Sequence, residues 1–225
     1  MKTYSIAIDG PSGAGKSTLA KALAAELGFF YVDTGAIYRT VGRYVARQGG
    51  DCSKEAVVLP CLETIRIAME YGEDGLQHML LNGEDVTRAI RQNEVSRYAS
   101  QVSPIPGVRA YLLEMQRAMA REHSVIMDGR DIGTVVLPDA DLKIFLTASV
   151  EARAQRRYRE LEEKGQSIPL EQVTQEIIQR DYADTHRETA PLKQAEDAVL
   201  ADTSSLDLDQ SLDLLRSIVK ERLKL

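Results

Sequence analysis

The stretch IAIDGPSGAGKST, which runs from Ile6 to Thr18, decides the fold. Its apolar beginning belongs to a strand predicted over residues 4–8, and a leucine stripe predicts a helix over residues 17–27. The glycines between them allow successive backbone N–H groups to point inward and surround phosphate oxygens. The residues that match the pattern GxxxxGK followed by Ser or Thr are Gly10, Gly15, Lys16 and Ser17.

This loop indicates that the ligand is a nucleoside triphosphate. We expect Lys16 to reach the β- and γ-phosphates and the Ser17 hydroxyl to bind Mg²⁺. The expected nucleotide-binding residues are Gly10, Pro11, Ser12, Gly13, Ala14, Gly15, Lys16, Ser17 and Thr18. The alternative is a glycine-rich turn without a ligand, but a chance match to the pattern is expected on the order of once in a hundred chains of this length.

Length and composition indicate one soluble domain. The chain has 225 residues, of which 44% are hydrophobic and 28% charged, and no apolar run reaches the roughly 18 residues of a membrane span. The net charge of −6 argues against a general nucleic-acid binder. Arginines gather over residues 153–187, which favours a small anionic ligand, although a solvated helix face is the alternative. Cys52 and Cys61 fit no zinc spacing, which predicts reduced thiols in the cytoplasm.

Strands and helices alternate along most of the chain. Further strands are predicted at residues 29–32, 125–127, 142–146 and 198–201, and further helices at 36–48, 150–164, 170–183 and 209–223. This alternation predicts an α/β fold with a five-stranded parallel sheet and helices on both faces. Residues 60–100 interrupt it, because the strand-like runs 65–71 and 76–81 are joined by a short turn and followed by Asn82-Gly83. We expect a small antiparallel insert there.

Three more polar clusters follow predicted strands or lie on a predicted helix. They are DTGAIYR at 33–39, DGRDIGT at 128–134 and RDYADTHR at 180–187. In the first, Asp33 or Thr34 can cap the next helix; in the third, helical spacing predicts Arg180, Asp184 and Arg187 on one face. A cap with a surface arginine, a turn with an internal Asp–Arg pair and a solvated salt bridge are the respective structural alternatives.

Together these clusters resemble the bacterial-type cytidylate kinase family. The segments IAIDGPSGAGKST, DTGAIYR, SQV, DGRDIGT, and RD followed by R…APL occur in that family's order and spacing over essentially the whole chain. The resemblance implies one P-loop kinase domain over residues 1–225. Its core would comprise residues 1–59, 101–152 and 190–225, with a nucleoside-monophosphate-binding insert at 60–100 and a helical lid at 153–189.

The resemblance also implies a reaction and a role for each matched residue. ATP would give its γ-phosphoryl group to CMP or dCMP, with Mg²⁺, to form ADP and CDP or dCDP. The catalytic residues would be Lys16, Arg130, Arg187 and Arg156. Arg39, Arg130 and Arg187 would bind the acceptor phosphate, Arg180 and Asp184 the ribose, and Ser100, Arg109 and Asp131 the cytosine, with Thr34 also in the substrate site. Arg156 and Arg157 would belong to a lid over the ATP phosphates, with Gly165 as its hinge.

Other readings of the site stay open at this point. The acceptor could be UMP, AMP, dTMP or a metabolite such as shikimate, and only Ser100, Arg109 and Asp131 favour cytosine. A GTP-dependent switch is a second reading, but the guanine-reading pattern Asn/Thr-Lys-x-Asp does not occur in the sequence. A nucleotide-binding subunit without turnover is a third. The resemblance favours a monomer whose partners are ATP and CMP or dCMP, with no nucleic acid and no membrane.

Overall fold

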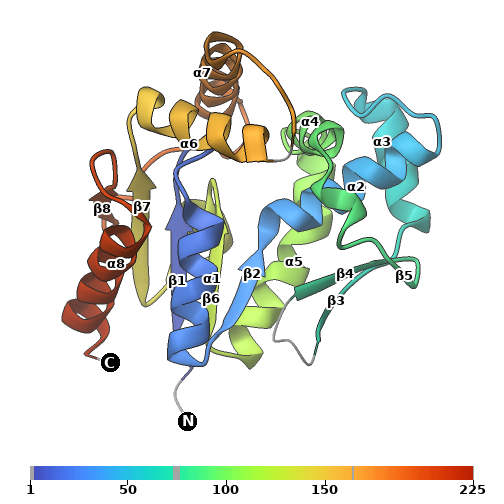
Figure 1. Ribbon diagram of the computed structural model, residues 1–225. Helices are drawn as coiled ribbons and strands as arrows, with labels where there is room; N and C mark the ends of the chain where they lie inside the picture. Colours follow the sequence, from blue (N-terminus) through green and yellow to red (C-terminus); the bar gives the residue numbers. More distant parts are fainter. Residues whose placement is uncertain (1–2, 73–76, 164, 225) are drawn as a thin grey trace.

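The computed structural model describes residues 3–72, 77–163 and 165–224, except the side chain of Asn93. Its centre is a five-stranded parallel sheet in the order β2-β6-β1-β7-β8 (Figure 1). The strands are β1 (Ser5–Asp9), β2 (Phe30–Asp33), β6 (Val125–Gly129), β7 (Leu142–Thr147) and β8 (Val199–Asp202). The predicted α/β fold and its five strands are confirmed, with strand ends that differ by one or two residues.

Helices cover both faces of this sheet, because alternate strand residues point to opposite sides. One face carries Ile8 and packs against α1 (Lys16–Leu27) and α8 (Leu208–Leu223). The opposite face carries Ala7 and packs against α5 (Pro106–Glu122). None of the described helices combines the length and apolarity that a bilayer span requires.

Between β2 and β6 the chain builds a second, smaller unit beside the sheet (Figure 1). Its elements are α2 (Thr34–Arg47), α3 (Glu55–Thr64), β3 (Ile67–Tyr71), β4 (Gln77–Leu81), β5 (Glu84–Asp85), the short 3₁₀ helix η1 (Ala89–Arg91) and α4 (Asn93–Val102). Its three strands pair in the antiparallel order β3-β4-β5, which confirms the predicted antiparallel pairing. Residues 73–76, which include most of the predicted turn, lie outside the described residues.

This smaller unit also covers the open edge of β2, the outermost strand of the main sheet. The backbone N–H of Asp33 donates to Gln77 Oε1 at 2.8 Å. Two residues earlier, the carbonyl of Tyr31 accepts from the hydroxyl of Tyr71 at 3.0 Å. Both groups belong to the side of β2 that faces away from β6, so two side chains provide the hydrogen bonds that a sixth strand would have made.

Two further helices lie across the carboxyl ends of the strands. They are α6 (Val150–Glu163) and α7 (Leu170–His186), and they appear at the top of Figure 1. Ala154, Leu161, Val173 and Ile177 give this pair its own small buried core. The predicted end of α6 at Lys164 lies outside the described residues.

The prediction that Arg187 shares a helix face with Arg180 and Asp184 is wrong. Helix α7 ends at His186, and Arg187 adopts an extended conformation with φ −66° and ψ 141°. Pro191 has no backbone N–H, so it cannot donate to the Arg187 carbonyl and continue the helix. The chain instead turns back, and the guanidinium of Arg187 donates through Nε to the carbonyl of Ala190 at 2.7 Å.

A close backbone approach explains why the phosphate-binding loop begins with glycine. Gly10 follows β1 with φ 152°, and a Cβ atom built there would lie 1.9 Å from the carbonyl oxygen of Leu146 on β7. No side chain can occupy that space without a shift of the strand backbone. Gly28, at the end of α1, also has a positive φ, of 67°, but a Cβ there would meet no atom within 4 Å.

We expect Gly10→Ala to reduce the free energy of unfolding by about 3 kcal/mol or more, because the methyl group forces two strands apart. Gly28→Ala is the matched control and should lose only about 1–2 kcal/mol, from backbone strain alone. Urea unfolding of both variants without nucleotide measures the difference. Equal losses in the two variants would contradict the close approach as the reason for Gly10.

Candidate active site

The predicted polar clusters meet because of the register of the sheet. Asp128 on β6 lies opposite Ile8 on β1 and opposite Asp33 on β2. The loops that leave these three strands therefore start side by side at one edge. Ligands of parallel sheets bind at this edge, where the carboxyl ends of the strands meet.

Lys16 lies inside the glycine-rich loop. It is 5% exposed, and its Nζ donates to the carbonyls of Gly10 and Pro11 at 2.8 Å each. Burial lowers the pKa of Lys16 well below its usual value, and the charge of Arg130 lowers it further. The phosphate groups of a bound nucleotide would favour the charged form again, because an anion stabilises a neighbouring cation.

Asp128 begins the DGRDIGT cluster, but the sequence analysis assigned it no role. In the structure it faces the Ser17 hydroxyl. Ser17 donates to Asp128 Oδ2 at 2.9 Å, and Tyr31 donates to Oδ1 at 2.9 Å. Burial raises the pKa of Asp128 to about 6, with Asp33 as a smaller cause. What could have pointed to Asp128 in the sequence is its place as a carboxylate directly after the predicted strand 125–127. In the structure this strand pairs with β1, which leads into the glycine-rich loop.

The hydroxyl of Ser17 and the carboxylate of Asp128 fit a Mg²⁺ ion. Both are oxygen ligands, and Mg²⁺ is commonly held by one or two protein oxygens together with water and substrate phosphates. Among the described residues, no group of three or more His, Cys, Asp or Glu side chains could hold a metal ion by itself. The donor set therefore suits an ion that arrives with a phosphate ligand.

Asp131 is shared by two arginines on the other side of the site. Its carboxylate accepts from Arg109 Nη2 on α5 and, at 3.3 Å, from Arg187 Nη2. Burial raises the pKa of Asp131, and the two arginines oppose that shift. The guanidinium of Arg109 also lies over the ring of Tyr38, with 5.7 Å between its carbon Cζ and the ring centroid. The structure thus brings together the predicted residues Arg109, Asp131 and Arg187.

Arg130 and Arg180 connect this group to the glycine-rich loop. Arg130 Nε donates to Asp184 at 2.7 Å, and both residues lie close enough to Lys16 to shift its pKa. Burial lowers the pKa of Arg180 to about 10, with the charge of Arg130 as the next cause. Within the described ranges, the Nε of Arg180 has no hydrogen-bond partner. Four predicted residues therefore lie close together: Lys16 from the glycine-rich loop, Arg130 from the segment after β6, and Arg180 and Asp184 from α7.

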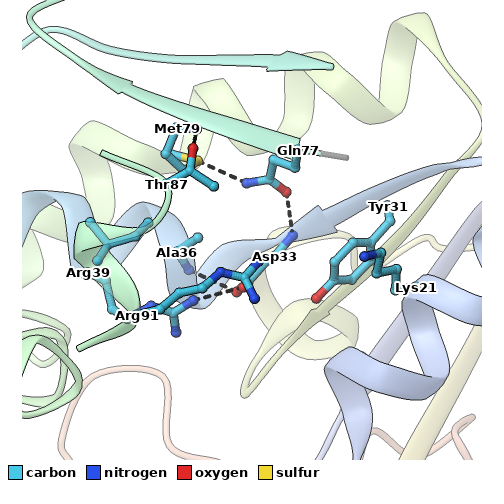
Figure 2. A pocket seen from close by; sticks show the side chains of 10 residues that line it. Lys21, Tyr31, Asp33, Ala36, Arg39, Gln77, Met79, Thr87 and Arg91 are labelled. Atoms are coloured by element: carbon cyan, nitrogen blue, oxygen red, sulfur yellow. Dashed lines mark hydrogen bonds and ion pairs between the residues drawn. The ribbon is translucent and has the colours of Figure 1, made fainter. Parts of the chain in front are cut away.

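Helix α2 contributes Arg39 to the site. Asp33 Oδ1 accepts from the backbone N–H of Ala36 at 2.8 Å, which confirms Asp33 as the helix cap. Asp33 Oδ2 holds Arg39 at 2.8 Å, as Figure 2 shows. Thr34 is buried, and its hydroxyl donates to the carbonyl of Asp128 at 2.7 Å.

Arg153 was predicted only as a member of the arginine-rich segment, but it holds the loop in place. It is 4% exposed, and its Nη1 donates to the carbonyl of Ser12 at 3.0 Å. Its Nε donates to the carbonyl of Ala148, and its Nη2 pairs with Asp181 of α7 at 2.7 Å. One side chain on α6 thus joins the glycine-rich loop to α7.

Three predicted residues lie apart from this cluster. Arg156 Nη1 and Nη2 donate to Thr203 in the turn after β8. Arg157 pairs with Glu160 on the surface of α6, although its charge still reaches Arg180. Ser100 donates to the carbonyl of Ser96 within α4.

Comparison with solved structures supports the fold. A solved structure of an uncharacterized protein from Eubacterium ventriosum shares the fold, with a TM-score of 0.55 and 13% identity over 98% of this chain and 100% of that chain. The parallel sheet and its glycine-rich loop define the chain as a P-loop protein of the α/β class.

The sequence comparisons identify the family. The family model for cytidylate kinase matches residues 6–221. Cytidylate kinases from Streptococcus pyogenes serotypes M4 and M5 are each 52% identical over 210 residues, which is 93% of this chain and 92% of theirs. The chain belongs to the cytidylate kinase family, and the prediction of a phosphotransferase of that family is confirmed.

Asp9, at the end of β1, is buried and connects this strand to the residues after β6, and its protonation should affect stability. Its carboxylate accepts from the backbone N–H groups of Ile132 at 2.8 Å and Gly133 at 2.7 Å. Burial raises the pKa of Asp9 to about 6, so ionisation costs more in the folded than in the unfolded chain. This contribution to stability is fully present below the unfolded pKa and is lost as the pH rises through about 6.

We expect wild type to be stabilised relative to Asp9→Asn by more at pH 4.5 than at pH 7.5. The difference should be about 2 kcal/mol, because pH 4.5 lies about 1.5 units below the folded pKa of about 6 and each unit corresponds to about 1.4 kcal/mol. Urea unfolding of both proteins across this pH range measures it. Parallel pH profiles for the two proteins would show that Asp9 does not titrate in this range.

Proposed function

We propose that this protein transfers the γ-phosphoryl group of ATP to CMP or dCMP, giving ADP and CDP or dCDP. The observation that carries the proposal is the buried group of Arg109, Asp131 and Arg187 beside Arg130, which lies close enough to Lys16 to shift its pKa. A donor site and an acceptor site are thereby adjacent. Membership of the cytidylate kinase family supports the choice of acceptor.

The proposed mechanism is positioning and charge neutralisation, because phosphoryl transfer asks little covalent chemistry of the protein. The loop from Gly10 to Thr18 would surround the ATP phosphates, and Lys16 would leave the loop carbonyls for the transferring phosphoryl group. Ser17 and Asp128 would hold Mg²⁺, which when bound neutralises charge on the β- and γ-phosphates. Arg130 and Arg187 would bind the transferred group from the acceptor side, because guanidinium binds phosphate with two parallel hydrogen bonds.

The acceptor residues follow from the same cluster. Arg39, Arg130 and Arg187 would bind the CMP phosphate in place of their present carboxylate or carbonyl partners. Arg180 and Asp184 would bind the ribose, while Ser100, Arg109 and Asp131 would read the cytosine edge and Thr34 would complete the site. A carboxylate can accept from the cytosine amine, and an arginine can donate to a ring acceptor.

Two segments are proposed to move or to enlarge the site. Residues 153–189 would form the lid, in which Arg156 and Arg157 turn from their present partners toward the ATP phosphates, with Gly165 at φ 71° as the hinge. Residues 60–100 would form the acceptor-binding insert. Such closure would exclude water and prevent hydrolysis of ATP. The proposal includes a monomer in the cytoplasm that binds neither nucleic acid nor membranes, in keeping with its free cysteines and acidic net charge.

The test is ADP release from Mg-ATP with CMP, dCMP, UMP, AMP, dTMP, shikimate or no acceptor. Strong release with CMP and dCMP and little with the others supports the proposal. Release with a different acceptor would retain the kinase and overturn the cytosine assignment. Release that does not depend on any acceptor would overturn the proposed transfer.

We expect Lys16→Met to reduce kcat by about 10²–10³-fold, the usual loss when a group that stabilises a developing charge is removed. Lys220→Met on α8 is the matched control, because it removes the same charge far from the loop. Steady-state rates with CMP, together with unfolding curves, separate catalysis from folding. Turnover near wild type in the folded Lys16→Met variant would overturn the role of Lys16.

Asp128→Asn should raise the Mg²⁺ concentration for half-maximal activity by about 10–100-fold, the range found when groups that orient metal ligands are changed. The amide keeps the shape of the carboxylate but lacks its charge, and it cannot accept from both Ser17 and Tyr31 because only one of its two polar atoms is an oxygen. A Mg²⁺ titration at saturating ATP and CMP measures the shift, with Asp209→Asn as the control. An unchanged midpoint would exclude Asp128 from the metal site.

A further inference from the structure

One buried side chain beside the acceptor cluster carries an amide nitrogen that lacks a hydrogen bond of normal geometry. Gln116 lies on the buried face of α5 and is 1% exposed. Among the residues that the structure describes, none makes a hydrogen bond with its amide nitrogen Nε2. Buried amide groups in folded proteins are nearly always paired, because an unpaired one gives up its bonds to water without replacement. The amide nitrogen carries two N–H groups, and its interaction with the Tyr38 hydroxyl engages at most one of them, so a donor remains for a ligand.

Gln116 lines a cavity of about 240 Å³ next to the acceptor cluster. The walls of the cavity are mainly apolar and include Leu113 and Val136, with Arg109, Gln116 and Tyr38 as polar groups. A few polar groups in an apolar pocket are typical of a site for a flat organic ring. The cavity has room for such a ring and a short row of groups to orient it.

Helical spacing connects Gln116 to the residues already assigned to the base. Arg109, Leu113 and Gln116 are separated by four and three residues on α5, so they share one face of the helix. Arg109 binds Asp131 at one end of this row. At the other end, the amide of Gln116 lies close enough to the Tyr38 hydroxyl to lower a pKa that burial raises.

We propose that Gln116 reads the base of the acceptor, with its Nε2–H donating to the pyrimidine carbonyl O2. This proposal rests on the proposed function. Cytosine offers one donor, its exocyclic amine, and two acceptors, N3 and O2. The amine has two N–H groups, from which Asp131 and the Ser100 hydroxyl accept, and Arg109 donates to N3, which leaves O2 for a further neutral donor. Gln116 supplies that donor.

Under this assignment Gln116 and Asp131 recognise different features of the base. Uracil carries the same carbonyl at O2 but the opposite donor and acceptor pattern at N3 and C4. Gln116 therefore recognises pyrimidines in general, whereas Asp131 separates cytosine from uracil. Loss of the Gln116 amide should weaken both acceptors by the same factor.

The test compares wild type with Gln116→Met, which keeps length and volume but removes the amide. We expect KM for CMP and for UMP each to rise about tenfold, the effect of one neutral hydrogen bond, with KM for ATP changed less than twofold. Leu113→Met is the matched control in the same cavity wall. It should leave the KM values for both acceptors within twofold, because it changes packing and no hydrogen bond.

Four outcomes would overturn the proposal. An unchanged KM for CMP in a folded Gln116→Met variant excludes the contact. Equal increases in KM for CMP and for ATP indicate a structural role. A changed ratio of the KM values for CMP and UMP places the amide on another edge of the base. An equal increase in KM for CMP in Leu113→Met assigns the effect to cavity shape. Wild type that does not use CMP would overturn the proposed function as well, which distinguishes the two failures.

An acceptor analogue keeps the test decisive if Gln116→Met does not fold. In 2-thio-CMP, sulfur replaces O2 and accepts hydrogen bonds weakly. Wild type should use it about tenfold less well than CMP in kcat/KM. Equal use of the two acceptors by wild type would overturn the O2 contact without any variant.

Discussion

The site depends on how the protein balances cations that it gathers in a small buried volume. Burial lowers the pKa of Lys16 and of Arg180, and the nearby charge of Arg130 lowers both further. Carboxylates offset this repulsion, because Asp184 holds Arg130 and Asp131 holds two arginines at once. Guanidinium groups bind phosphate in the same bidentate way as carboxylate, so under the proposed function substrate phosphates would replace these internal counter-ions. The ion pairs with Asp184 and Asp131 thus stabilise the buried arginines in the folded chain and leave them able to bind an anionic ligand.

The parallel sheet is what makes this balance possible. Its register sets the ends of β1, β2 and β6 side by side, and each end carries an aspartate with a different task. Asp9 binds two backbone N–H groups, Asp33 caps α2 and holds Arg39, and Asp128 accepts from Ser17 and Tyr31. Three carboxylates of one residue type are thus distinguished by their neighbours alone.

The sequence predicted the elements of this site better than their connections. The strands, the glycine-rich loop and the arginine clusters follow from periodicity and local chemistry, and the structure contains all of them. The backbone partners of Asp9 and the Ser12 partner of Arg153 are more than a hundred residues away in the chain, so no local pattern reveals them. The position of Arg187 was missed for another reason: helical spacing was extended past His186, although Pro191 follows closely. Pair assignments among several arginines and aspartates need the register of the sheet, which a single sequence does not contain.

The contacts of Gln77 and Tyr71 with β2 have a consequence for solubility. An outer strand with free N–H and C=O groups is a template on which another chain can add a strand and begin aggregation. Here side chains from the smaller unit occupy those groups at Asp33 and Tyr31. The segment that carries Tyr71 and Gln77 therefore protects this edge from edge-to-edge association. A form shortened within this segment would need another way to shield the strand.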